Sequence, residues 1–104
     1  MGYKSRGLVF DQFNIGDVFV CQARTVTEAD TVNFAGISGD YNPLHTDEEF
    51  GKTTPLGGRI AHGVLVLAMA TGQANQLGVF EGTTIALMQQ TVKYVGAVKF
   101  GDTI

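Results

Sequence analysis

The sequence predicts a single α+β domain, residues 1–104, in which a curved sheet surrounds one long apolar helix. Residues 63–77 contain seven consecutive apolar side chains and stop before Gly78, so a helix here must be buried on nearly all sides. Residues 17–26 and 82–100, which flank it, are rich in β-branched and aromatic residues, as strands are. A sheet that curves around the helix satisfies both observations.

The first half of the chain predicts a strand followed by a helix. Residues 17–26 form the expected strand, with Cys21 as a buried thiol inside it. A helix over residues 28–36 should follow, because Thr27 can cap it and Asp30 stands at the capping-box position. The glycines after this helix would end it and place the next turn.

That next turn and a short helix lie between the two long elements. Pro43 predicts an ordered turn over residues 40–45 that stays out of a helix. Thr46 repeats the helix-start pattern, with Glu49 at the capping-box position, and Thr53 begins the loop that ends this helix. The acidic run 47–49 is therefore interpreted as a solvated helix start rather than a metal site.

The last segment predicts strand structure that breaks off. Residues 82–100 should bend at Gly96, and Gly101-Asp102 is typical of a hairpin turn, yet only Thr103 and Ile104 follow it. We expect the domain to lack its last strands. An exposed sheet edge would then invite pairing with another chain.

Composition excludes two classes of protein. The formal net charge is −3 and the seven Lys and Arg residues are scattered, which argues against binding to nucleic acid. No apolar segment is long enough to predict a membrane-spanning helix. The single cysteine cannot form an internal disulfide, so we expect a reducing, cytoplasmic setting.

Asp40 and His45 are the candidate acid/base pair. They lie five positions apart on the predicted turn, which can direct a carboxylate and an imidazole at one small volume, as proton transfer requires. Gly63 stands where the apolar helix should begin. Its backbone N–H would be an unpaired donor at the positive end of the helix, available to a developing negative charge.

These residues carry a resemblance. Ser38-Gly39-Asp40-Tyr41-Asn42-Pro43-Leu44-His45, followed by Gly58-Arg59-Ile60-Ala61-His62-Gly63, resembles the signature of the MaoC-like dehydratases and (R)-specific enoyl-CoA hydratases. Residues 10–17 and 98–104 are similar to flanking segments of that family. The resemblance implies a hot dog fold, in which a curved antiparallel sheet wraps around a long central helix. It also implies a hydro-lyase that adds water to trans-2-enoyl-CoA to give (R)-3-hydroxyacyl-CoA, or the reverse dehydration.

The resemblance assigns roles to individual residues. Asp40 and His45 would hold the water between them, with Asp40 as the preferred base, and Gly63 would bind the thioester oxygen. The side chains expected beside the substrate are Asn42, Ala61, His62 and Val64. For Asn42 and His62 the residue types favour structural support of the turn and loop over direct contact.

The expected partners follow from the same resemblance. The substrate is an acyl-CoA, no metal, redox group or separate cofactor is required, and the chain should form a homodimer or higher homo-oligomer. Cations for the CoA phosphates are available at Arg59, Lys52 and Lys93, and the sequence does not choose among them.

Three alternatives remain open at this point. The chain could be an inactive subunit whose sheet a partner completes, or a thioesterase in which the activated water attacks the carbonyl carbon. His45 and Asp47 with His62 also match a two-histidine, one-carboxylate iron triad. The long apolar helix after His62 disfavours this third alternative, because enzymes with that triad are larger all-β chains.

Overall fold

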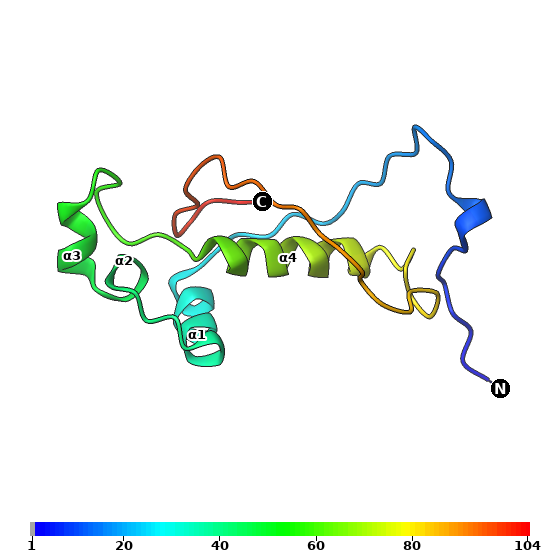
Figure 1. The fold of residues 1–104 in the computed structure, drawn as a ribbon, viewed down its shortest axis with the longest axis horizontal. Helices are drawn as coiled ribbons and strands as arrows, with labels where there is room; N and C mark the ends of the chain where they lie inside the picture. The colour runs from blue at the N-terminus through cyan, green and yellow to red at the C-terminus, as the bar shows by residue number, and fades with distance from the viewer. Residues whose placement is uncertain (1) are drawn as a thin grey trace.

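The computed structural model describes residues 2–104, and its ordered elements are helical. Figure 1 shows three of them gathered at one end of the longest helix, with the start of the chain at its other end. In chain order they are η1 (Phe10–Gln12), α1 (Glu28–Ser38), α2 (Pro43–Thr46), α3 (Glu48–Thr53) and α4 (Gly63–Gln76).

Helix α1 confirms the predicted cap. The Asp30 N–H donates to Thr27 Oγ1 at 3.2 Å, and the Thr27 N–H donates to the Asp30 carboxylate at 2.9 Å, so the two residues satisfy each other's backbone donors. The helix continues to Ser38, two residues beyond the predicted end. It stops there because Gly39 adopts a left-handed conformation with φ of +77°.

The prediction that Pro43 keeps its segment out of a helix is wrong. Pro43 is the first residue of α2, where its fixed φ suits the helix and its missing N–H costs no hydrogen bond. The cap of α3 is likewise Asp47, whose carboxylate accepts from the Phe50 N–H at 3.0 Å, and not Thr46. Glu49 therefore stands inside α3 and not at a capping-box position.

Helix α4 covers the predicted segment almost completely and ends before Gly78, whose φ is +83°. Its burial differs from the prediction, because one face is buried while Val64 on another is 57% exposed. The core consists of Val26, Ala61, Leu65 and Met69, with Phe34, Val66, Val98 and Ile104 packed against it. Among residues 2–104, none of the helices is both long and apolar enough to cross a bilayer.

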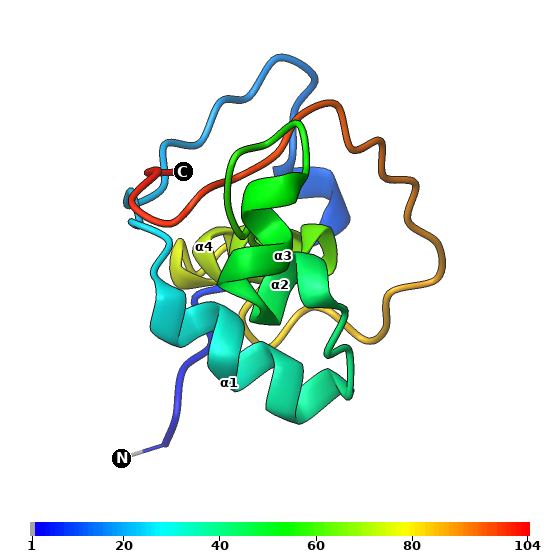
Figure 2. The same cartoon turned by 90° about the vertical axis from the view of Figure 1, so that its left-hand side faces the viewer.

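The predicted sheet is not formed within the described part of the chain. Residues 24–26 pair with residues 102–104 through an antiparallel bridge between Thr25 and Thr103, and Arg24 and Ile104 exchange two hydrogen bonds of 2.8 Å. The predicted turn at residue 101 does form, and it directs the chain end toward this pairing. Elsewhere the two predicted strands run on opposite sides of α4 without a partner strand (Figure 2). A strand needs a hydrogen-bonded partner, and neither segment has one here.

These unpaired segments, residues 14–23 and 84–97, are called the extended arms below. Their apolar side chains face solvent: Val20 is 87% exposed, Ile85 100% and Met88 93%. Cys21 is also exposed, contrary to the prediction, because nothing covers its segment. The radius of gyration of 17.1 Å exceeds the roughly 13 Å of a compact chain of about this length, as the arms require.

Candidate active site

Asp40 lies in a tight turn that links α1 to α2. Its N–H donates to Ser38 Oγ at 3.1 Å, and its carboxylate accepts from the Asn42 N–H at 3.1 Å. The Asn42 side chain in turn accepts from the Leu44 N–H at 3.1 Å and caps α2. The Asn42 side chain thus supports the turn, while the Asp40 carboxylate keeps a second oxygen for other partners.

His45 lies on α2 with its ring orientation fixed by the loop before α4. Its Nδ1 is 2.7 Å from the carbonyl oxygen of Ile60. Because a carbonyl only accepts, Nδ1 carries the hydrogen, and Nε2 of the neutral ring is left with a free lone pair. His45 therefore presents a nitrogen that can take up a proton.

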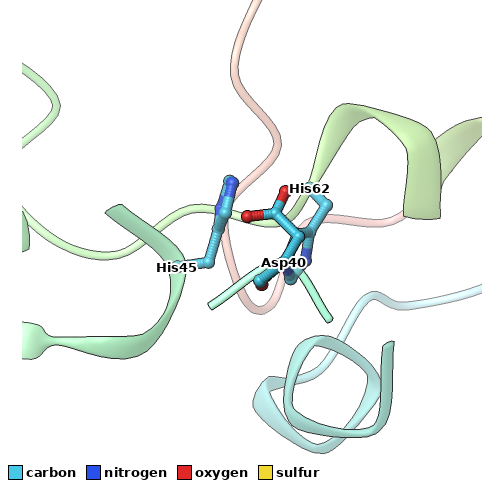
Figure 3. Close-up of side chains that lie close together, drawn as sticks. All are labelled: Asp40, His45 and His62. Atoms are coloured by element: carbon cyan, nitrogen blue, oxygen red, sulfur yellow. The ribbon is translucent and has the colours of Figure 1, made fainter. Parts of the chain in front are cut away.

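The Asp40 carboxylate, His45 and His62 come together in one group (Figure 3), and one ligand atom from each lies within 4.8 Å of the others. A water molecule that bonds both Asp40 and His45 at about 2.8 Å would separate the two atoms by about 4.6 Å. That separation falls inside the 4.8 Å limit, so the spacing of the group is compatible with one water held between Asp40 and His45.

Gly63 is the first residue of α4, and no described residue accepts a hydrogen bond from its N–H. The N–H lies at the positive end of the helix. A Cβ at this position would be 2.8 Å from two ring carbons of Tyr94, so any larger residue would displace that ring. Glycine thus lets Tyr94 pack here and leaves the donor accessible.

An apolar groove of about 540 Å³ runs between α4 and residues 92–98, with His45 and Gly63 in its lining. Val64 and Ala61 also line it, and the Ala61 N–H donates to the Val98 carbonyl at 2.9 Å. Of the predicted substrate-binding residues, Asn42 and His62 stand outside this lining. His62 is buried behind the pair, with 2% of its surface exposed.

Two of the three candidate phosphate-binding cations have carboxylate partners. Arg59 pairs with Glu48 at 2.6 Å and Glu28 at 2.9 Å, and these hydrogen bonds, that to Glu48 first, raise the pKa of its guanidinium. Lys52 pairs with Glu49 at 3.3 Å. The remaining candidate, Lys93, lines the groove.

The three grouped side chains also offer ligand types that a transition metal accepts. Asp47 is not among them, because its carboxylate caps α3. The rings of His45 and His62 are stacked, with centroids 3.9 Å apart and planes at 27°, so their lone pairs run side by side rather than converging. Zinc-like ions bind nitrogen at about 2.0 Å, and the group would need to rearrange to enclose one.

Sequence reasoning missed the groups that come from distant segments. The Ile60 carbonyl orients His45, and the Tyr94 ring covers Gly63. Tyr94 lies more than thirty positions from Gly63 along the chain, and no local pattern links them. Only the tertiary structure brings these groups to the site.

The site brings a carboxylate and an imidazole together near the amino end of α4, a helix with one buried face. A family model described as the MaoC like domain matches residues 12–104. The chain therefore belongs to the MaoC-like dehydratase family.

Relatives in sequence and in structure agree with this assignment. The 3-hydroxybutyryl-CoA dehydratase of Methylorubrum extorquens is 32% identical over 95% of this chain and 61% of its own length. The (R)-specific enoyl-CoA hydratase of Rhodospirillum rubrum is 36% identical over 79% of this chain and 56% of its own. The solved structure of a monoamine oxidase regulatory protein from Archaeoglobus has a TM-score of 0.85 and 38% identity, covering 93% of this chain and 66% of that one. The chain thus spans about three-fifths of the length of each of these two curated relatives.

Proposed function

We propose that this domain is a hydro-lyase that adds water to trans-2-enoyl-CoA and gives (R)-3-hydroxyacyl-CoA, or catalyses the reverse dehydration. The supporting observation is that the Asp40 carboxylate lies within 4.8 Å of a His45 ring nitrogen, and that His45 lines one groove with Gly63, at the positive end of α4. The names of the Rhodospirillum and Methylorubrum relatives describe the two directions of such a reaction.

The chemistry uses each part of the site. The water oxygen bonds to the β-carbon of the enoyl group while Asp40 accepts a water proton, and the alkene electrons move toward the thioester oxygen. The Gly63 N–H donates to that oxygen as negative charge develops on it. The Asp40–His45 pair then supplies a proton to the α-carbon. Because the two groups are close enough to interact, this second proton is assigned to the pair and not to one residue.

The apolar groove supports an acyl chain as the group that enters it. Its walls come from α4 and residues 92–98, and His45 and Gly63, beside which the thioester would lie, are part of its lining. No cation is assigned to the CoA phosphates, because Arg59 and Lys52 are engaged with carboxylates and Lys93 lines the groove proposed for the acyl chain. No metal or redox cofactor is proposed, and a cytoplasmic setting remains a prediction based on the single cysteine.

The test is hydration of crotonyl-CoA, followed by loss of the enoyl absorbance. Asp40→Asn and His45→Gln should each lower turnover by at least about 100-fold, because each removes a proton-transfer group. Glu49→Gln is the matched control, since this carboxylate is exposed and stands on α3 outside the site, and its turnover should be unchanged. Circular dichroism checks that the variants fold.

Two outcomes would contradict the proposal. Near wild-type turnover in either variant would remove that residue from the mechanism. Release of free thiol from an acyl-CoA, without hydration of the alkene, would instead identify a thioesterase.

A second candidate is a subunit that needs a partner chain. The extended arms expose Val20, Ile85 and Met88, and unpaired strands with apolar side chains favour pairing with another chain. We propose a homodimer as the working state. A native mass of one chain would contradict it, and activity that appears only on mixing with a longer relative would favour the inactive subunit.

A further inference from the structure

His62 contacts all three groups of the candidate site. Its Nε2 is 2.9 Å from the Asp40 carbonyl oxygen, its ring face stacks on His45 with centroids 3.9 Å apart, and it precedes Gly63 in the chain. The N–H of Gly63 belongs to the peptide that joins these two residues. Movement of His62 would therefore displace the carboxylate turn, the imidazole and the backbone donor together.

The hydrogen bonds fix one tautomer for each ring. The Asp40 carbonyl can only accept, so His62 carries its hydrogen on Nε2, whereas His45 carries its hydrogen on Nδ1 because of the Ile60 carbonyl. Residues 60 and 62 thus hold both ends of the turn that contains Asp40 and His45. The two histidines have opposite tautomers.

The second nitrogen of His62 has no route into the chemistry. His62 Nδ1 is buried without a hydrogen-bond partner, and the residue does not line the groove. The Phe34 ring packs edge-on against the imidazole, with centroids 5.0 Å apart. His45 and Phe34 therefore both pack against the ring, and His62 as a whole is 2% exposed.

We propose that His62 is a positioning residue, fixed as the Nε2–H tautomer, that sets the separation of the Asp40 carboxylate and His45 Nε2 and transfers no proton itself. This inference rests on the proposed function for its effect on rate. Its statement about tautomer and ring position stands on geometry alone. Displacement of a reacting group by about 1 Å can cost about 100-fold in rate, so a buried support of this kind affects turnover strongly.

The experiment separates the two contacts of His62. His62→Gln keeps an N–H that can reach the Asp40 carbonyl and loses the stacked ring, whereas His62→Phe keeps a ring and loses the donor. We expect kcat for crotonyl-CoA to fall by about 10-fold in the first and about 100-fold in the second, with KM changed less than threefold, because His62 lies outside the groove. Thr31→Val is the matched control, since Thr31 Oγ1 is another buried atom without a partner and stands on α1. Its kcat should be unchanged.

Nitrogen NMR of the two histidines gives a readout that needs no activity. The chain has only two histidines, so the His62→Gln spectrum assigns His45 directly. In the wild-type protein at neutral pH, His45 should show the Nδ1–H tautomer and His62 the Nε2–H tautomer. The His45 ring protons should move downfield in His62→Gln, which removes the stacked ring, and less in His62→Phe.

Each failure has its own meaning. The same tautomer in both rings, or unchanged His45 ring shifts in His62→Gln, would overturn the inference whatever the activity is. Unchanged kcat in both His62 variants of an active protein would also overturn it. A wild-type protein that does not hydrate enoyl-CoA would contradict the proposed function. The tautomer and ring-shift measurements would then decide by themselves whether His62 positions Asp40 and His45.

Discussion

The helical region from α1 to α3 and the extended arms are built by different means. In residues 27–54 each helix begins at a side chain that caps it, such as Thr27, Asn42 or Asp47, and its backbone bonds close within a few residues. The arms contain sequence that favours strands, but their backbones pair with no other strand within the described chain, and their apolar side chains are exposed.

The difference teaches that a helix is a local product and a strand is not. Capping residues and intrahelical bonds satisfy a helix from its own sequence. A β-branched segment gains little until a second strand supplies the opposite hydrogen bonds. Asp40 and His45 lie in the α1–α3 region, whose helices are determined by local sequence. The apolar groove has one wall in an extended arm.

The largest effect should come from the core beneath α4. Leu65→Ala should lower the free energy of unfolding by about 2–4 kcal/mol, because it leaves a cavity where a buried side chain stood. Urea unfolding measures it. Val64→Ala on an exposed part of the same helix should cost less than about 1 kcal/mol. Equal losses would show that α4 is covered on both faces in solution.

The ion pairs that join the helices come next. Arg59→Ala should cost about 1–2 kcal/mol, because the mostly buried guanidinium bridges Glu28 of α1 and Glu48 of α3 and lies over the Phe100 ring. Lys52→Ala, which breaks one exposed pair, should change stability by less than about 0.5 kcal/mol. Thermal unfolding of both variants tests the ranking. Equal stability of the two variants would show that the Arg59 bridge contributes no more than the exposed Lys52 pair.

A smaller effect with a defined pH dependence is expected at the α1 cap. The Thr27 N–H bonded to the Asp30 carboxylate holds the pKa of that carboxyl below its usual range. A lowered folded-state pKa stabilises the fold above the unfolded value of about 3.9, and this contribution is lost as pH falls through the folded pKa. Asp30→Asn should therefore cost about 1 kcal/mol at pH 7 and progressively less below pH 4. A loss that does not change with pH would contradict this account.

The smallest effect is expected on the arms. Ile85 is fully exposed, so Ile85→Thr should change the free energy of unfolding by less than about 0.5 kcal/mol. Denaturant midpoints at two protein concentrations measure it. A larger loss that depends on concentration would show that another copy covers the arm, which would sharpen the homodimer proposal.

Sequence patterns predicted what local chemistry determines. The Thr27–Asp30 cap, the extent of α4 and the turn at residue 101 were all identified correctly. The role of Pro43 was predicted wrongly, because proline can either end a helix or begin one. Here the Asn42 cap beside it decides that Pro43 begins α2.

The sheet and the geometry of the site depend on contacts between distant residues. Sequence reasoning placed Asp40, His45 and Gly63 as candidates without knowing their distances, and the structure brings the first two within reach of one water. It could not find the Ile60 carbonyl or the Tyr94 ring, because their contacts join segments fifteen and more residues apart. The curved sheet predicted from the sequence is not formed within residues 2–104, because its strands also need partners from distant parts of a chain.

One hydrogen bond described above determines how the groove can deform. The Ala61 N–H ties the Val98 carbonyl to the loop before α4, while residues 92–95 of the facing wall form no backbone hydrogen bond within the described chain. The groove is therefore rigid at its reacting end and compliant farther along. Molecules of different length could bind in the same way beside Ala61, while displacement of residues 92–95 accommodates the rest of each molecule.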